Sequence, residues 1–148
     1  MEPVLIEGVE VLDAKILSDE RGRLFKFIDK QSLGFEGFGE VYLSETLPGV
    51  VKAWKYHENT HQNFLVPVGQ IKLVLFDDRE NSATQGQTME IKVGLDSSHR
   101  VVIPPQIWYG FQTISKESSL IVNCIDQVYD PEQTSSKPLG DKTIPYLF

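Results

Sequence analysis

The chain has 148 residues, enough for one domain with a single hydrophobic core, and its lone cysteine excludes an internal disulfide. Its 21 acidic and 14 basic residues give a formal net charge of -7 with no cluster of Lys and Arg, which excludes a nucleic-acid backbone as the partner. No apolar run reaches transmembrane length and no signal peptide is recognisable, so we expect no membrane partner and a reducing, cytoplasmic location.

Glycines divide the chain into short segments rich in Val, Ile, Phe, Tyr and Leu, which is typical of an all-β protein. Residues 88–93 alternate between apolar and polar side chains, the pattern of a strand with one solvated face. We expect a polar loop at 77–86, a tight reversal at 68–70, and no helix other than a short one near 30–33. The predicted strands, in chain order, are 9–17, 23–29, 39–46, 51–57, 64–68, 70–77, 88–93, 100–103, 109–114 and 120–127. About ten strands in one domain favour a double-sheet jelly roll or barrel, because closure covers most strand edges.

The fourth predicted strand carries the residues most suggestive of chemistry. At strand spacing, Lys55 and His57 point to one side of it, and Trp54 and Tyr56 to the other. A lysine and a histidine on the inner wall of a small barrel form a natural proton-handling or ligand-binding pair. Lys52 has the wrong parity to share this face unless a β-bulge intervenes.

Each of these residues also has a plainer interpretation. Lys55 acts as a base if burial and a neighbouring cation favour its neutral amine, and is otherwise a charged lysine paired with a carboxylate at the rim. His57 is equally consistent with a hydrogen-bonded structural histidine. We expect Trp54 to pack in a core or a dimer interface, and His61 and His99 to be solvated.

The spacing around this strand matches the first motif of the cupin family of jelly rolls, in which a glycine precedes two histidines, a glutamate and a second glycine. Here the frame spans 49–69, with Lys55, His57 and Gln62 at the ligand positions and Tyr109 at the histidine position of the second motif. A protonated lysine has no lone pair, and glutamine and tyrosine are poor substitutes for carboxylate and imidazole. We therefore expect no metal and no cofactor, and an organic ligand in the mouth of the barrel.

Further motifs spread over almost the whole chain, at 19–22, 49–57, 69–79, the loop ending at Gly86, 103–105, 109–111, 129–131 and 144–146. In their order and spacing the chain resembles the dTDP-4-dehydrorhamnose 3,5-epimerase family, a metal-free branch of the cupins. The resemblance implies a cupin jelly roll, here one domain over 1–148 whose N-terminal strands contribute to a homodimer. It also implies a nucleotide sugar as the ligand of the barrel.

The resemblance assigns roles to individual positions. The central strand of the family carries a histidine base that removes protons beside the 4-keto group of the sugar, and Lys55 occupies this position. The phosphate-binding arginine of the family is replaced by Lys52, and its enolate-steadying lysine aligns with Asn63. The histidine that follows the Pro-Pro pair aligns with Tyr109.

Two further positions concern the general acid and the phosphates. The tyrosine acid of the family falls near 127–128, and an alignment gap would bring Tyr129 into its place. Arg21 is retained, and in the family it reaches the nucleotide phosphates across the dimer.

The leading hypothesis is a sugar-nucleotide epimerase or isomerase that removes a proton next to the ketone of a 4-keto-deoxysugar nucleotide, in deoxysugar or surface-polysaccharide synthesis. Two alternatives stay open, a non-catalytic nucleotide-sugar-binding cupin and a sugar-nucleotide 3,4-ketoisomerase, so whether the protein is an enzyme is undecided at this point. The candidate catalytic residues are Lys55, His57 and Tyr109. The candidate substrate-binding residues are Arg21, Lys52, Asn63 and Tyr129.

Overall fold

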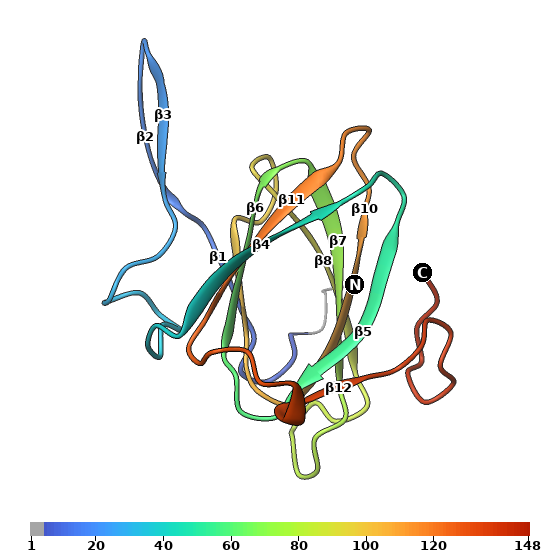
Figure 1. Ribbon diagram of the computed structural model, residues 1–148. Helices are drawn as coiled ribbons and strands as arrows, with labels where there is room; N and C mark the ends of the chain where they lie inside the picture. Colours follow the sequence, from blue (N-terminus) through green and yellow to red (C-terminus); the bar gives the residue numbers. More distant parts are fainter. Residues whose placement is uncertain (1–4) are drawn as a thin grey trace.

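The computed structural model describes residues 5–148 and is built almost entirely from β-strands (Figure 1). Nine of the ten predicted strands are present, with bounds that differ by a few residues, and the first is divided into two. The elements are β1 (Glu10–Leu12), β2 (Lys15–Asp19), β3 (Gly22–Lys26), β4 (Glu40–Thr46), β5 (Val51–His57), β6 (Gln62–Val68), β7 (Gln70–Asp77), β8 (Thr88–Gly94), β9 (Arg100–Ile103), β10 (Ile107–Thr113), β11 (Ser119–Ile125), the 3-10 helix η1 (Pro131–Gln133) and β12 (Thr134–Ser136).

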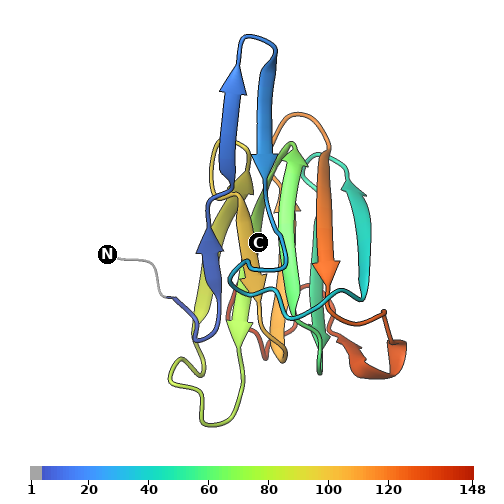
Figure 2. The same cartoon turned by 90° about the vertical axis from the view of Figure 1, so that its left-hand side faces the viewer.

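Two five-stranded sheets form the body of the protein. One has the strand order β1-β9-β6-β11-β4 and the other β12-β5-β10-β7-β8, and the neighbouring strands are antiparallel throughout. The sheets face each other and close into a double-sheet jelly roll, as Figure 2 shows. The predicted fold class is therefore confirmed.

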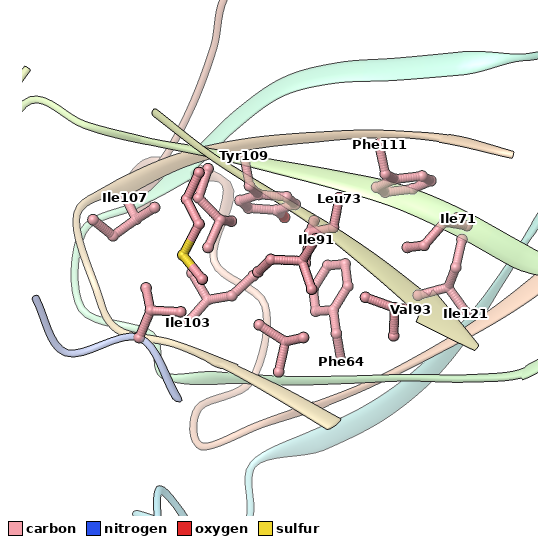
Figure 3. Packing of buried hydrophobic residues seen from close by; sticks show 14 of the residues in the cluster. Phe64, Ile71, Leu73, Ile91, Val93, Ile103, Ile107, Tyr109, Phe111 and Ile121 are labelled. Atoms are coloured by element: carbon pink, nitrogen blue, oxygen red, sulfur yellow. The ribbon is translucent and has the colours of Figure 1, made fainter. Parts of the chain in front are cut away.

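Apolar side chains from both sheets fill the space between them. On β8, Met89, Ile91 and Val93 are buried, whereas Glu90 and Lys92 are exposed, as the alternation in the sequence predicts. Figure 3 shows the packing of this core, in which the labelled residues come from β6, β7, β8, β9, β10 and β11. The core occupies one part of the barrel and leaves its mouth between β4 and β5 to polar residues.

The region before β4 differs from the prediction in two places. The expected strand 9–17 is divided into β1 and β2, because the backbone N–H of Ala14 donates to Nδ1 of His99 instead of to a neighbouring strand. The expected helix at 30–33 is a turn, in which the Asp29 carboxylate accepts a hydrogen bond of 2.7 Å from the N–H two residues later.

A hairpin made of β2 and β3 projects beyond the barrel (Figures 1 and 2). It packs on no other strand along most of its length, and it exposes the apolar side chains of Leu17 and Leu24. Arg21 lies at its tip. Exposed apolar residues on a projecting element mark a surface suited to contact with another protein chain.

The C-terminal part contains elements that the sequence did not predict. β12 pairs with β5, and the chain then crosses the outer face of the second sheet, where Ile144, Tyr146 and Phe148 cover Trp54. Trp54 is 1% exposed and packs in this outer core, as expected. Within residues 5–148, no helix is long and apolar enough to cross a membrane.

Candidate active site at the mouth of the barrel

A cavity of about 380 Å³ opens between β4 and β5, where the two sheets separate. Its inner wall is apolar and aromatic, with Phe64, Phe111 and Ile121 continuing into the core. Three lysines also line it: Lys52 and Lys55, whose side chains are exposed at the rim, and the half-buried Lys137. The cavity thus passes from cationic at the surface to uncharged in its depth.

A β-bulge in β5 brings the two lysines to the same face. In the pairing of β5 with β10, Lys55 lies opposite Tyr109 and Lys52 lies opposite Phe111, whereas Trp54 has no partner because the register shifts there. Tyr109 and Phe111 both point into the barrel, so both lysines point to its mouth. In an unbroken strand, side chains three positions apart point to opposite faces. The one extra residue of the bulge puts Lys52 and Lys55 on the same face.

His57 and Tyr109 form a buried pair next to Lys55. Nε2 of His57 is 2.8 Å from the hydroxyl of Tyr109, and Nδ1 is 3.1 Å from Oγ1 of Thr134. Because the Thr134 hydroxyl donates to the carbonyl oxygen of Asp130, it is free to accept the Nδ1 proton. Nε2 therefore carries no proton, and the Tyr109 hydroxyl donates to it.

Burial keeps both members of this pair neutral. The exposed fraction is 7% for His57 and 5% for Tyr109. Burial, together with the positive charge of Lys55, lowers the pKa of His57 to about 4. Burial also raises the pKa of Tyr109 well above that of a free tyrosine. At neutral pH neither group is therefore charged, and the Tyr109 proton stays on its oxygen in the hydrogen bond to His57.

The two lysines at the rim differ in their surroundings. Nζ of Lys52 donates to Oγ of Ser44 at 3.2 Å and to the carbonyl oxygen of Glu45 at 3.0 Å, which ties β5 to β4 across the mouth. Lys55 makes no hydrogen bond with a described residue, and its side chain is exposed. The burial that we expected for Lys55 is thus not present in this structure, because the cavity is open to solvent beside it.

Polar residues that the sequence analysis missed line the opposite wall of the cavity. Asn123 on β11 donates to the hydroxyl of Tyr42 on β4 and to Oε1 of Gln62 on β6, each at 2.9 Å. The sequence of β4 contained the signal: Val41 and Leu43 are exposed, while Tyr42 and Ser44, which alternate with them, face inward. In a closed barrel, such an inverted strand pattern indicates a polar interior.

Three of the predicted substrate-binding residues lie away from this cavity. Asn63 faces the outside of its sheet, because Phe64 takes the inward position, and Oδ1 of Asn63 is held by Arg100 at 2.6 Å. Arg21, at the tip of the β2–β3 hairpin, pairs with Asp19. Tyr129 is exposed in the loop after β11 and does not line the cavity, but it lies near enough to Tyr42 and Tyr109 to help raise the pKa of both.

The other two histidines are anchored rather than solvated, contrary to our expectation. Nδ1 of His61 is 2.8 Å from a carboxylate oxygen of Asp126. His99 is largely buried; its Nδ1 accepts from the N–H of Ala14, and its Nε2 donates to the carbonyl oxygen of Leu95. Among residues 5–148, no three His, Cys, Asp or Glu side chains are grouped so that they could hold a metal ion.

Comparisons with known proteins agree with this architecture. A family model described as dTDP-4-dehydrorhamnose 3,5-epimerase matches residues 3–145. The chain is 37% identical to a probable low-salt glycan biosynthesis epimerase, Agl13, of Haloferax volcanii, over 95% of the chain and 88% of the relative. It is 32% identical to the spore coat polysaccharide biosynthesis protein SpsL of Bacillus subtilis, over 95% and 94%. A crystal structure of dTDP sugar isomerase from Desulfovibrio desulfuricans G20 superposes with a TM-score of 0.90 at 37% identity, over 95% of this chain and 90% of that one.

Proposed function

The chain belongs to the dTDP-4-dehydrorhamnose 3,5-epimerase family, and we propose that it binds a nucleotide sugar at the mouth of its barrel and exchanges a proton on a carbon next to the 4-keto group. The observation that carries this proposal is the cavity itself, in which two lysines at the rim lead to a buried, neutral His57–Tyr109 pair. The relatives are named for glycan and spore coat polysaccharide synthesis, which supports a role in making a surface glycan.

The distribution of charge favours one orientation of such a ligand. Lys52 and Lys55 stand at the rim, and no carboxylate is among the described residues that line the cavity. In a protein of net charge -7, the cations of Lys52 and Lys137 in the cavity lining favour a dianion such as a diphosphate, which leaves Lys55 for the sugar. The uncharged sugar then occupies the inner part, beside Tyr109 and Phe64.

The proton chemistry follows from this placement. The neutral amine of Lys55 removes the proton from the carbon next to the ketone, and the electron pair of the C–H bond moves onto the ketone oxygen to give an enolate. Tyr109, whose position is fixed by His57, donates its proton to the reacting sugar once its hydroxyl gives up the hydrogen bond to Nε2 of His57. Return of a proton to the opposite face of the carbon gives the epimer. Because Lys55 is exposed in this structure, the mechanism requires that the bound ligand cover it and exclude water.

We further propose that the chain, a single domain over 1–148, acts in the cytoplasm as a homodimer. The β2–β3 hairpin supports this assembly, since it projects beyond its own barrel and carries Arg21 away from its own cavity. Arg21 then serves the phosphates of a ligand in a second copy of the chain, and Tyr129 borders the ligand from the loop after β11. Asn63 is withdrawn from the binding residues because it faces the outside of the sheet.

The second candidate, a non-catalytic binder, is favoured by one specific observation. The position of the family's histidine base is occupied by Lys55, which makes no hydrogen bond with a described residue to orient it, and which solvent reaches. In this case the cavity binds the nucleotide sugar without exchanging its protons.

Solvent exchange separates the two candidates. The protein is incubated in D2O with dTDP-4-keto-6-deoxyglucose, and deuterium at the carbons next to the ketone is measured by mass spectrometry and NMR against a protein-free control. We expect enzyme-dependent incorporation, lowered about 100-fold or more by Lys55→Ala. Lys52→Ala is the matched control at the rim, which should raise KM more than it lowers kcat. If the ligand raises the melting temperature but no exchange occurs with this or related 4-keto sugars, the protein is a binder.

A further inference from the structure

An unpartnered oxygen lies in the wall of the cavity that faces the lysines. Asn123 is 1% exposed, and both protons of its Nδ2 are used, one by the hydroxyl of Tyr42 and one by Oε1 of Gln62. Its Oδ1 is buried and accepts a hydrogen bond from no described residue. A buried carbonyl without a donor is destabilising, and such groups are rare in folded proteins.

The strand register places the side chain of Asn123 in the cavity wall. Asn123 lies opposite Tyr42 on one neighbouring strand and opposite Phe64 on the other, and all three side chains line the cavity. The carboxamide cannot turn freely, because its nitrogen is held from both sides. The orientation of Oδ1 is therefore set before a ligand arrives.

Tyr42 complements this acceptor. Its hydroxyl oxygen accepts from Asn123, so its own proton is available, and it donates to no described residue. An acceptor and a donor thus stand side by side on an uncharged wall. A ligand hydroxyl can donate to Oδ1 of Asn123 and accept from the hydroxyl of Tyr42 at the same time. A carbonyl or an ionised phosphate group has no proton to donate to Oδ1.

We propose that Asn123 is a specificity-determining residue, whose Oδ1 accepts a hydrogen bond from a ring hydroxyl of the sugar in the cavity. The inference rests on the proposed function for the class of ligand, but it does not depend on catalysis. A sugar that lacks this hydroxyl leaves Oδ1 unpartnered, as it is in the free protein, and therefore binds more weakly than one that supplies the missing donor.

A binding cycle tests the proposal with stable probes. Affinities of dTDP-glucose, of its 2-deoxy, 3-deoxy, 4-deoxy and 6-deoxy analogues, and of dTDP alone are measured calorimetrically for the wild type and for Asn123→Ala. We expect one deoxy analogue to bind the wild type about tenfold more weakly than dTDP-glucose, and this difference to vanish in Asn123→Ala. The affinity for dTDP alone should change less than twofold. Cys124→Ala, the adjacent change on the outer face of β11, is the matched control and should keep the tenfold difference.

The outcomes distinguish this inference from the function on which it rests. If the wild type binds dTDP-glucose and every deoxy analogue with equal affinity, the proposed role of Asn123 is wrong, but the ligand class stands. A tenfold difference that persists in Asn123→Ala also overturns it, because another residue then holds the hydroxyl. Failure of the wild type to bind dTDP, dTDP-glucose and UDP-glucose overturns the ligand class and this inference together. Equal affinities on the wild type overturn the inference even if Asn123→Ala does not fold.

Discussion

The buried imidazole of His57 should make the stability of the protein depend on pH in a predictable window. Its pKa of about 4 in the folded protein lies below the value of 6.5 for a free histidine, so the unfolded chain binds a proton more readily than the folded one. The contribution of His57 to the free energy of unfolding is therefore fully present above pH 6.5. It falls as the pH drops from 6.5 toward 4, and it does not change further below pH 4. The difference between the two pKa values corresponds to about 3 kcal/mol in the free energy of unfolding.

His57→Gln isolates this effect, since glutamine can keep a hydrogen bond to Tyr109 but does not titrate. Urea unfolding of both proteins at pH 7 and near pH 3.5 gives the difference between their free energies of unfolding at each pH. The surface carboxylates titrate in both proteins, so their contribution cancels in this difference. We expect the wild type to lose up to about 3 kcal/mol relative to His57→Gln over this range. NMR should show His57 as the Nδ1-protonated tautomer at neutral pH. A pKa of His57 near 6.5 in an NMR titration of the folded protein refutes the reasoning. So does a difference in the free energy of unfolding between the wild type and His57→Gln that does not change with pH.

Three other substitutions test the framework around the site. Asp77→Ala removes a fully buried carboxylate that Arg79 and two hydroxyl groups bind, and leaves the guanidinium unpaired; we expect a loss of about 3–5 kcal/mol, measured by urea unfolding. Gly110→Ala places a methyl group against the side chain of Ala53 on the neighbouring strand, so it should lower the melting temperature markedly, and unchanged melting contradicts this packing. Thr134→Val leaves the Nδ1 proton of the buried imidazole without an acceptor and should cost about 1 kcal/mol at pH 7, whereas Thr134→Ser should retain most of the stability.

Most of the fold could be predicted because its signals are local. Alternation of apolar and polar residues identifies a strand without knowledge of its partners, as in β8, and glycines mark where strands end. The motif spacing around Lys55 identified the cupin frame, which placed Tyr109 at a ligand position, and motifs along the whole chain identified the family. β12 was missed because Thr134 and its neighbours have no apolar alternation and become a strand only by pairing with β5.

The sequence by itself thus determined the jelly roll, the family and the position of Lys55 and His57, because strand alternation and motif spacing can be recognised along the chain without knowledge of which strands pair. The tertiary structure alone decided which side chains share the cavity. One bulge at Trp54 turned Lys52 toward the mouth, and strand register turned Asn63 away from it and Asn123 into it. Bulges and registers arise from pairing between distant strands, so a period-2 pattern read along one strand cannot contain them.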